Sequence, residues 1–264
     1  MYDEAVVEKY ESIQFTIADR IGYIVFNRPP LNIFTISMMK EINAALNAMS
    51  RNMSVSCIVF AAIAGSKAFS AGVSVEEHRP ETVYQMLDSF HSIFRTLYAY
   101  SKPIIAVVDG PALGGGCELV AFCDVVIATD RAKFGQPEIR LGVFPPMGSI
   151  ILPRVIGLKR ATELMYTGET IDALEAQSLG LVNVIVEVEN LQERVQEILS
   201  RFSRESAVAL EATRRAILTA YYPDFNELLS RVEDQYLLQL MNCQDPIEGI
   251  NAFLEKRPPV WKHK

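Results

Sequence analysis

Short apolar segments alternate with helical patterns along the first half of the chain, and this alternation restricts the possible folds more than any other feature. The strand-like segments are residues 12–18, 21–27, 56–64, 103–110 and 124–130. Between them, residues 37–50 and 81–99 are helical in pattern, and residues 113–123 start as a glycine loop and continue as a helix. Asp19 and Arg20 join the first two strands as a hairpin, and Ser37 is the candidate N-cap of the first helix. Strands that alternate with helices predict an α/β sheet with helices packed on it.

The second half of the chain has a different character. A single short strand is expected near 182–187, and the rest is helical in pattern over residues 158–167, 172–179, 190–202, 205–221, 224–241 and 245–256. We therefore predict an α/β core over residues 1–200 followed by a helical C-terminal region over residues 201–264.

Composition excludes several classes of protein. Half of the 264 residues are hydrophobic and 22% are charged, which supplies a large core and argues against disorder. The net charge is −7 and no basic cluster occurs, so a nucleic-acid partner is not expected. The first residues do not form a signal peptide, and no apolar segment approaches about 18 uninterrupted residues, so we expect a cytoplasmic protein without a membrane span.

The cysteines and histidines give no metal-binding pattern. The four cysteines contain no CxxC pair, and the three histidines are scattered. We expect buried free thiols and no metal site.

Two glycine-containing turns follow apolar strands. Residues 68–74 (AFSAGVS) are either an ordinary turn or one that presents a backbone N–H to a ligand. Residues 110–118 (GPALGGGCE) contain three glycines and open a helix, and N–H groups at a helix N-terminus stabilise negative charge. No Gly-Lys-Ser/Thr follows, so this is not a nucleotide-binding Walker loop, and a small oxyanion fits it better than pyrophosphate.

Two acidic residues follow neighbouring strand segments. Glu118 lies in the first turn of the helix after the glycines, and Glu138 follows Pro137, shortly after the strand at 124–130. Each carboxylate could simply stabilise the start of a helix. If they converge, however, they can divide the roles of general acid and general base.

Taken together, these segments resemble the crotonase (enoyl-CoA hydratase/isomerase) superfamily across nearly the whole chain. The segments that carry the resemblance are NRPPLNIFT (27–35), AFSAGVS (68–74), GPALGGGCELVAFCD (110–124), FGQPEIRLGVFP (134–145) and EGINAFLEKRPP (248–259).

The resemblance implies a fold and a mechanism. The fold would be a ClpP/crotonase-like spiral of ββα units, with the helical C-terminal region building a homotrimer or a dimer of trimers. The N–H groups of Ala71 and Gly115 would form an oxyanion hole for the thioester carbonyl. Glu118 and Glu138 would hold the water to be added, with Glu138 in the position of the proton donor. No separate cofactor is implied, because coenzyme A is part of the acyl-CoA substrate.

The resemblance also implies substrate contacts. The residues expected to bind the acyl group or the coenzyme A are Arg28, Ala68, Gly72, Val73, Ser74, Gly114, Phe144, Phe253 and Lys256. His78 and His91 are expected to pack or to cap a helix.

Two departures from the family pattern bear on the substrate. Ser74 stands where hydratases often carry aspartate, and residues 142–149 (GVFPPMGS) replace a glycine-rich stretch, which predicts a bulkier acyl pocket. With residues 71–97, they resemble cyclohexa-1,5-diene-1-carbonyl-CoA hydratases of anaerobic benzoyl-CoA degradation, which form 6-hydroxycyclohex-1-ene-1-carbonyl-CoA. The alternatives are a general short-chain enoyl-CoA hydratase, an enoyl-CoA isomerase, a non-catalytic CoA- or RNA-binding homologue, and a structural oligomer subunit.

Overall fold

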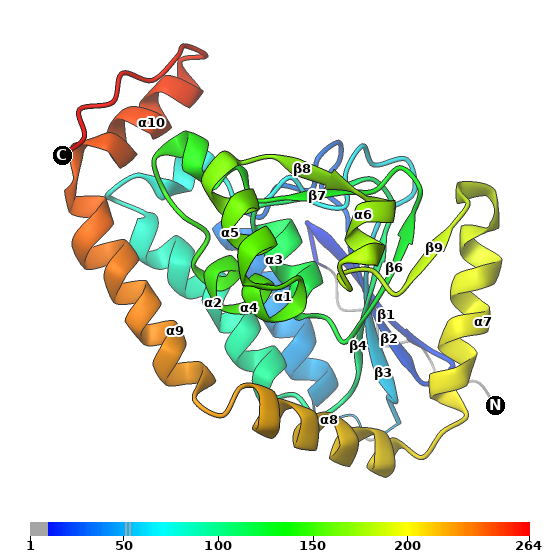
Figure 1. Ribbon diagram of the computed structural model, residues 1–264. Helices are drawn as coiled ribbons and strands as arrows, with labels where there is room; N and C mark the ends of the chain where they lie inside the picture. Colours follow the sequence, from blue (N-terminus) through cyan, green and yellow to red (C-terminus); the bar gives the residue numbers. More distant parts are fainter. Residues whose placement is uncertain (1–9, 51, 53) are drawn as a thin grey trace.

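Residues 10–50, 52 and 54–264, which the computed structural model describes, form two β-sheets with helices around them (Figure 1). The larger sheet has the strand order β1-β2-β3-β4-β6-β9, and the smaller sheet has the order β5-β7-β8. The strands are β1 (Ile13–Ala18), β2 (Ile21–Phe26), β3 (Cys57–Ala62), β4 (Ile104–Val108), β5 (Pro111–Leu113), β6 (Val125–Thr129), β7 (Lys133–Gly135), β8 (Thr170–Asp172) and β9 (Val184–Val186).

The α-helices lie mainly beside and after these strands. They are α1 (Ile36–Ser50), α2 (Val83–Ala99), α3 (Gly115–Phe122), α4 (Pro146–Val155), α5 (Leu158–Thr167), α6 (Ala173–Ser178), α7 (Leu191–Ser203), α8 (Ala207–Tyr221), α9 (Phe225–Asp234) and α10 (Gln244–Leu254). Figure 1 shows α8 and α9 running along one side of the molecule toward α10 and the C-terminus.

Successive turns of the chain stack on one another. One turn runs through β4 and β5 into α3, and the next runs through β6 and β7. β4 pairs with β6 in the larger sheet, and β5 pairs with β7 in the smaller one, both in parallel. Each turn therefore gives one strand to each sheet, and equivalent points of the two turns lie side by side.

The larger sheet is covered on both faces. Along β3, Ile58 and Phe60 belong to the main core, whereas Cys57 and Val59 belong to a second cluster on the opposite face. Successive side chains of a strand point to opposite faces, so a continuous apolar run requires cover on both. Helix α7 packs on the second cluster, on the far side of the sheet from α1, α2 and α3 (Figure 1).

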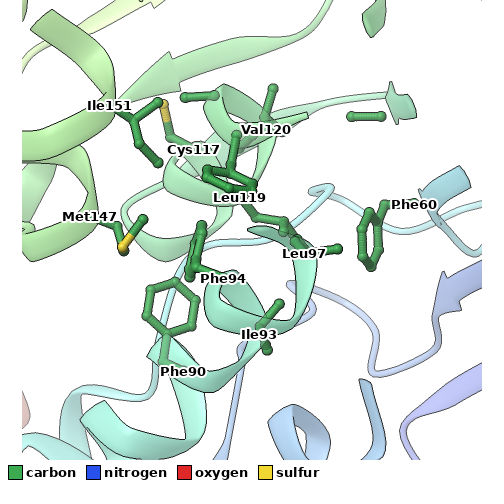
Figure 2. Close-up of a cluster of buried hydrophobic side chains, with 14 of the residues drawn as sticks. Phe60, Phe90, Ile93, Phe94, Leu97, Cys117, Leu119, Val120, Met147 and Ile151 are labelled. Atoms are coloured by element: carbon green, nitrogen blue, oxygen red, sulfur yellow. The ribbon is translucent and has the colours of Figure 1, made fainter. Parts of the chain in front are cut away.

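The main core continues beneath the N-terminus of α3. Figure 2 shows Phe90 and Phe94 of α2 gathered with Leu119 of α3 and Met147 of α4. The rings of Phe90 and Phe94 meet edge to face, with their centroids 5.0 Å apart. The contact of these α2 and α4 side chains with Leu119 fixes the position of α3 and of its first turn.

Two ion pairs join the C-terminal helices to the core. Arg214 of α8 is 3% exposed and donates from Nε to Asp124 Oδ2 at 2.7 Å. Glu233 of α9 accepts from Arg95 of α2 and lies 2.7 Å from Nδ1 of the buried His91. The Arg214 pair fixes the position of α8, because Arg214 is buried and removing Asp124 would leave its charge uncompensated.

The predicted elements agree with the structure except in a few places. The prediction of one helix over 224–241 is wrong, because α9 ends at Asp234 and a π-helical segment, Gln235–Gln239, follows. The prediction of Ser37 as N-cap is also wrong. Helix α1 begins at Ile36, and Thr35 accepts from the N–H of Met38 at 3.4 Å, so Ser37 lies inside the first turn.

Sequence patterns missed α4 and the strands β5, β7 and β8. Each of these strands is three residues long, too short for a periodicity to be recognised. Helix α4 opens with Pro146 and contains Gly148 and Pro153, which hide its helical character. The boundary predicted at residue 200 falls inside α7, and the division into two regions stays a prediction.

Candidate active site

A cavity of about 250 Å³ lies where α3, the turn after β7 and the start of α4 meet. Its walls are mostly apolar, and Glu118 and Glu138 both line it. The other lining residues are Ala71, Gly72, Val73, Val75, His78, Met86, Leu87, Phe90, Gly114, Gly115, Pro137, Arg140, Leu141, Phe144, Pro145, Pro146, Tyr236 and Phe253.

The pairing of β5 with β7 brings the two acids to this cavity. Leu113 pairs with Gly135, and the N–H of Gly114 donates to the carbonyl of Gly135 at 3.0 Å. Both strands end at this point, so the chain segments that carry Glu118 and Glu138 leave the same edge of the sheet. A side chain at position 114 would obstruct this arrangement, because a Cβ there would lie 2.7 Å from Glu138 Oε1.

The N-terminus of α4 holds the carboxyl group of Glu118. Glu118 is 2% exposed, and its Oε1 accepts from the N–H of Gly148 at 2.6 Å. Burial raises the pKa of Glu118 to about 7, although the backbone N–H groups of Gly148 and Met147 favour the charged form. Glu118 therefore exchanges a proton readily near neutral pH.

Glu138 is half-buried and adjoins the amide of Gln136, which is completely buried. With its amide assigned so that the nitrogen faces Glu138, Gln136 donates to both carboxyl oxygens at 3.1 Å. Burial, and then the charge of Glu118, raise the pKa of Glu138 well above its ordinary value. As the pH rises, Glu118 thus loses its proton before Glu138 does.

Two unpaired backbone N–H groups lie beside the acids. Among the described residues, neither the N–H of Val73 nor that of Gly115 has a hydrogen-bond acceptor. The two residues are close, since a Cβ placed on Gly115 would lie 2.8 Å from Cγ2 of Val73. The parallel bridge between Phe34 and Val73 uses the carbonyl of Gly72 and the N–H of Ser74, so the N–H of Val73 itself stays outside it. Two such donors, of which Gly115 lies at the start of α3, form a site for a developing negative charge.

The prediction that Ala71 contributes to the oxyanion hole is wrong. Its N–H donates to the carbonyl of Leu31 at 2.9 Å and is not available to a ligand. Ala71 lines the cavity, but the free donor in this turn belongs to Val73, two residues further on.

The other predicted contacts divide into two groups. Those that line the cavity are Gly72, Val73, Gly114, Phe144 and Phe253. Those that are not part of its lining are Arg28, Ala68, Ser74 and Lys256. Arg28 donates to the carbonyl of Ile33, and Ala68 is buried, so neither meets a ligand in this cavity.

Several residues of the site escaped sequence reasoning. Gln136 and Gly148 hold the two acids, and both could have been suspected from their positions next to the motif residues. His78 lines the cavity, with Nδ1 2.8 Å from the carbonyl of Ser74. Tyr236 reaches the cavity from the π-helical segment after α9, and no sequence signal marks it.

Comparison with known proteins identifies the family of the chain. Residues 16–264 match the family described as enoyl-CoA hydratase/isomerase. The chain belongs to this family. It is therefore a member of the crotonase superfamily and has the α/β fold of that group.

Three individual relatives place the chain within the enoyl-CoA hydratase/isomerase family. A protein named probable enoyl-CoA hydratase in Mycobacterium bovis is 38% identical over 97% of this chain and 99% of its own length. A cyclohexa-1,5-dienecarbonyl-CoA hydratase from Thauera aromatica is 35% identical over 90% of this chain and 91% of its own. The crystal structure of an enoyl-CoA hydratase from Mycobacterium avium subsp. paratuberculosis superimposes with a TM-score of 0.86 at 26% identity, covering 96% of this chain and all of that one.

Within residues 10–50, 52 and 54–264, no helix is both long and apolar enough to cross a membrane. In the same residues, no three side chains of His, Cys, Asp or Glu are grouped so that they could hold a metal ion.

The close approach of Gly114 to Glu138 leads to a prediction. In Gly114→Ala, the new Cβ would displace the Glu138 carboxyl from its place in the cavity. A misplacement of about 1 Å at a catalytic group can reduce the rate by about 10²-fold, and we expect kcat/KM for an enoyl-CoA thioester to fall on that scale.

Gly65→Ala is the matched control. Gly65 also has a positive φ, +84, but its Cβ would meet nothing within 4 Å. Both variants carry backbone strain, and only Gly114→Ala places an atom against Glu138. Equal losses of activity in the two, measured at equal folded fraction by circular dichroism, would show that backbone strain alone is responsible.

Proposed function

We propose that the protein is an acyl-CoA hydratase that adds water to a conjugated enoyl-CoA or dienoyl-CoA thioester. The observation that carries this proposal is the cavity in which two carboxyl groups of different proton affinity lie beside two unpaired N–H groups. A thioester carbonyl accepting from the N–H groups of Val73 and Gly115 would be stabilised as it gains negative charge.

The two acids then have distinct roles. The charged Glu118 accepts a proton from the water as the water oxygen forms a bond to the β-carbon. The electron pair of the double bond moves toward the thioester oxygen and gives an enolate, which the two N–H groups stabilise. Glu138 donates its proton to carbon, and transfer of a proton from Glu118 to Glu138 restores the starting state.

The most specific substrate that we propose is cyclohexa-1,5-diene-1-carbonyl-CoA. Phe144, Pro145 and Pro146 form a rigid apolar wall, which suits a flat ring better than a flexible chain. A dienolate can accept the proton at its vinylogous carbon, and the product would be 6-hydroxycyclohex-1-ene-1-carbonyl-CoA. The 35% identity to the Thauera aromatica hydratase supports this substrate, and the place of the reaction would be anaerobic benzoyl-CoA degradation.

A general short-chain enoyl-CoA hydratase is the second candidate. The 38% identity to the Mycobacterium bovis protein favours it, over a slightly larger part of both chains. For either substrate we propose that no cofactor besides the coenzyme A of the substrate takes part. Assembly into a homotrimer or a dimer of trimers stays a prediction.

The substrate can be decided with two thioesters. The purified protein is incubated separately with cyclohexa-1,5-diene-1-carbonyl-CoA and crotonyl-CoA, following the absorbance of the conjugated thioester and the product mass. Addition of one water to the diene, with crotonyl-CoA poorly used, is the expected result. Rapid hydration of crotonyl-CoA alone would leave the general hydratase, and turnover of neither would overturn the proposal.

Removing either acid tests the division of roles. We expect Glu118→Gln and Glu138→Gln each to lower kcat by about 10²–10⁴-fold, the usual contribution of a general acid or base. Both variants should fold, because glutamine has a similar shape to glutamate. Burial raises the pKa of each carboxyl above its unfolded value of about 4.3, so at higher pH each glutamate costs folding free energy that a neutral glutamine does not. Melting temperatures at pH 8 should therefore not fall.

Glu205→Gln provides the control for this pair of variants, since Glu205 is exposed and is not part of the cavity lining. If Glu118→Gln kept most of the activity while Glu138→Gln lost it, a single acid would suffice. That outcome would favour double-bond isomerisation over hydration.

The pH dependence follows from the two proton affinities. The active form has Glu118 charged and Glu138 protonated. The rate should therefore rise with pH through an apparent pKa of about 7, as Glu118 loses its proton. It should fall again at higher pH, where Glu138 loses its own, and the two values belong to the interacting pair. A profile of kcat/KM between pH 5 and 10 without the acid limb would contradict the role of Glu118.

A further inference from the structure

The hydroxyl group of Tyr236 is buried without a partner. Tyr236 is 1% exposed, and among the described residues its hydroxyl has no hydrogen-bond donor or acceptor. Leaving a buried hydroxyl unpaired costs folding free energy that a phenylalanine at this position would avoid. The hydroxyl therefore calls for a role outside folding.

Tyr236 lines the active-site cavity from a segment of unusual backbone geometry. It lies in the π-helical segment Gln235–Gln239, where the N–H of Leu240 donates to the carbonyls of both Gln235 and Tyr236. Such insertions into a helix occur often at functional sites. The ring packs edge-on against Phe144, with the centroids 5.4 Å apart, and Tyr236 lines the cavity together with both glutamates.

The hydroxyl acts as a proton donor in hydrogen bonding. Burial, and then the charges of Glu138 and Glu118, raise the pKa of Tyr236 above its ordinary value. The phenol is therefore neutral at any pH at which the site is active, and it can donate to an oxygen atom of a ligand.

The chemistry of hydration identifies that oxygen. The acyl part of an enoyl thioester has one oxygen, the carbonyl, and the N–H groups of Val73 and Gly115 are the donors available to it. The oxygen that remains is the one added to the chain, which is first the water and then the hydroxyl of the product.

We propose that Tyr236 is a substrate-binding residue whose hydroxyl donates a hydrogen bond to the oxygen that hydration adds to the acyl group. This inference rests on the proposed hydratase function and extends it, because it assigns recognition of the hydroxyacyl product to a residue from the C-terminal helices. Tyr236 and Phe144 then form one wall of the cavity. Their rings present an apolar surface to the acyl group of the substrate, and the Tyr236 hydroxyl is its one polar group.

Binding measurements separate this role from packing. Affinities of Tyr236→Phe and the wild-type protein are measured by calorimetry for two pairs of thioesters that differ by the added hydroxyl. The first pair is 6-hydroxycyclohex-1-ene-1-carbonyl-CoA and cyclohex-1-ene-1-carbonyl-CoA, and the second is 3-hydroxybutyryl-CoA and butyryl-CoA. In the pair whose substrate the wild type hydrates, the hydroxylated ligand should bind the variant about 3- to 10-fold more weakly, and the other ligand equally well.

Tyr100→Phe is the matched control. Tyr100 is also buried with an unpaired hydroxyl among the described residues, but it does not line the active-site cavity. Both variants should melt at the same or a higher temperature than the wild type, because each loses an unpaired buried hydroxyl. Only Tyr236→Phe should lose affinity for the hydroxylated ligand and show a lower kcat/KM.

Each other outcome overturns the inference. Equal weakening of both ligands would show that Tyr236 only shapes the cavity, and unchanged binding of both would show that its hydroxyl meets no ligand. These results leave the hydratase function intact as long as the wild type turns over either substrate. If the wild type neither hydrates nor binds any of these thioesters, the proposed function fails and this inference fails with it.

Discussion

The parallel pairing of β5 with β7 is the contact on which the site depends. It joins two successive turns of the chain at Leu113 and Gly135, and it makes their carboxyl ends coincide. Glu118 and Glu138 are 20 positions apart in the sequence, yet this pairing sets them at one cavity. The absence of a side chain at Gly114 allows the two segments to approach closely enough.

Different surroundings separate the proton affinities of these two acids. The N–H groups at the start of α4 point at Glu118 and favour its charge, which offsets part of the cost of burial. Glu138 lies in the short 3₁₀ helix Pro137–Leu141, and there burial and then the nearby charge of Glu118 work against its ionisation. A site that needs one base and one acid thus obtains both from the same residue type, as the environment of each decides its role.

The sequence predicted the parts of this protein that depend on local pattern. Apolar runs such as residues 56–64 identified buried strands, and the glycines before Glu118 identified a helix start able to stabilise negative charge. The sequence could not show whether Ala71 or Val73 supplies the free N–H group of the oxyanion hole. That depends on a hydrogen bond from the N–H of Ala71 to the carbonyl of Leu31, 40 residues earlier in the chain. Which N–H of a turn stays free is a tertiary property that no local pattern encodes.

Helix α4 and the π-helical segment were missed for related reasons. Prolines and a glycine conceal α4, although its first N–H groups hold Glu118. The sequence around Tyr236 reads as an uninterrupted helix, and packing against Phe144 and the core accompanies the change in backbone hydrogen bonding. At these two segments local propensity conflicts with the final structure, as expected where function competes with folding.

The cavity holds polar groups that burial makes costly, and the apolar framework around it offsets that cost. Glu118 and the hydroxyl of Tyr236 are both almost fully buried. The Glu118 carboxyl accepts from the N–H of Gly148, whereas the Tyr236 hydroxyl has no partner among the described residues. The rings of Phe90 and Phe94 beneath α3 supply the close packing that keeps the first turn of that helix in place. Because the surrounding side chains are closely packed, these buried polar groups cannot turn toward solvent. A ligand that forms hydrogen bonds with them supplies partners that the folded protein lacks, and those bonds contribute to its binding.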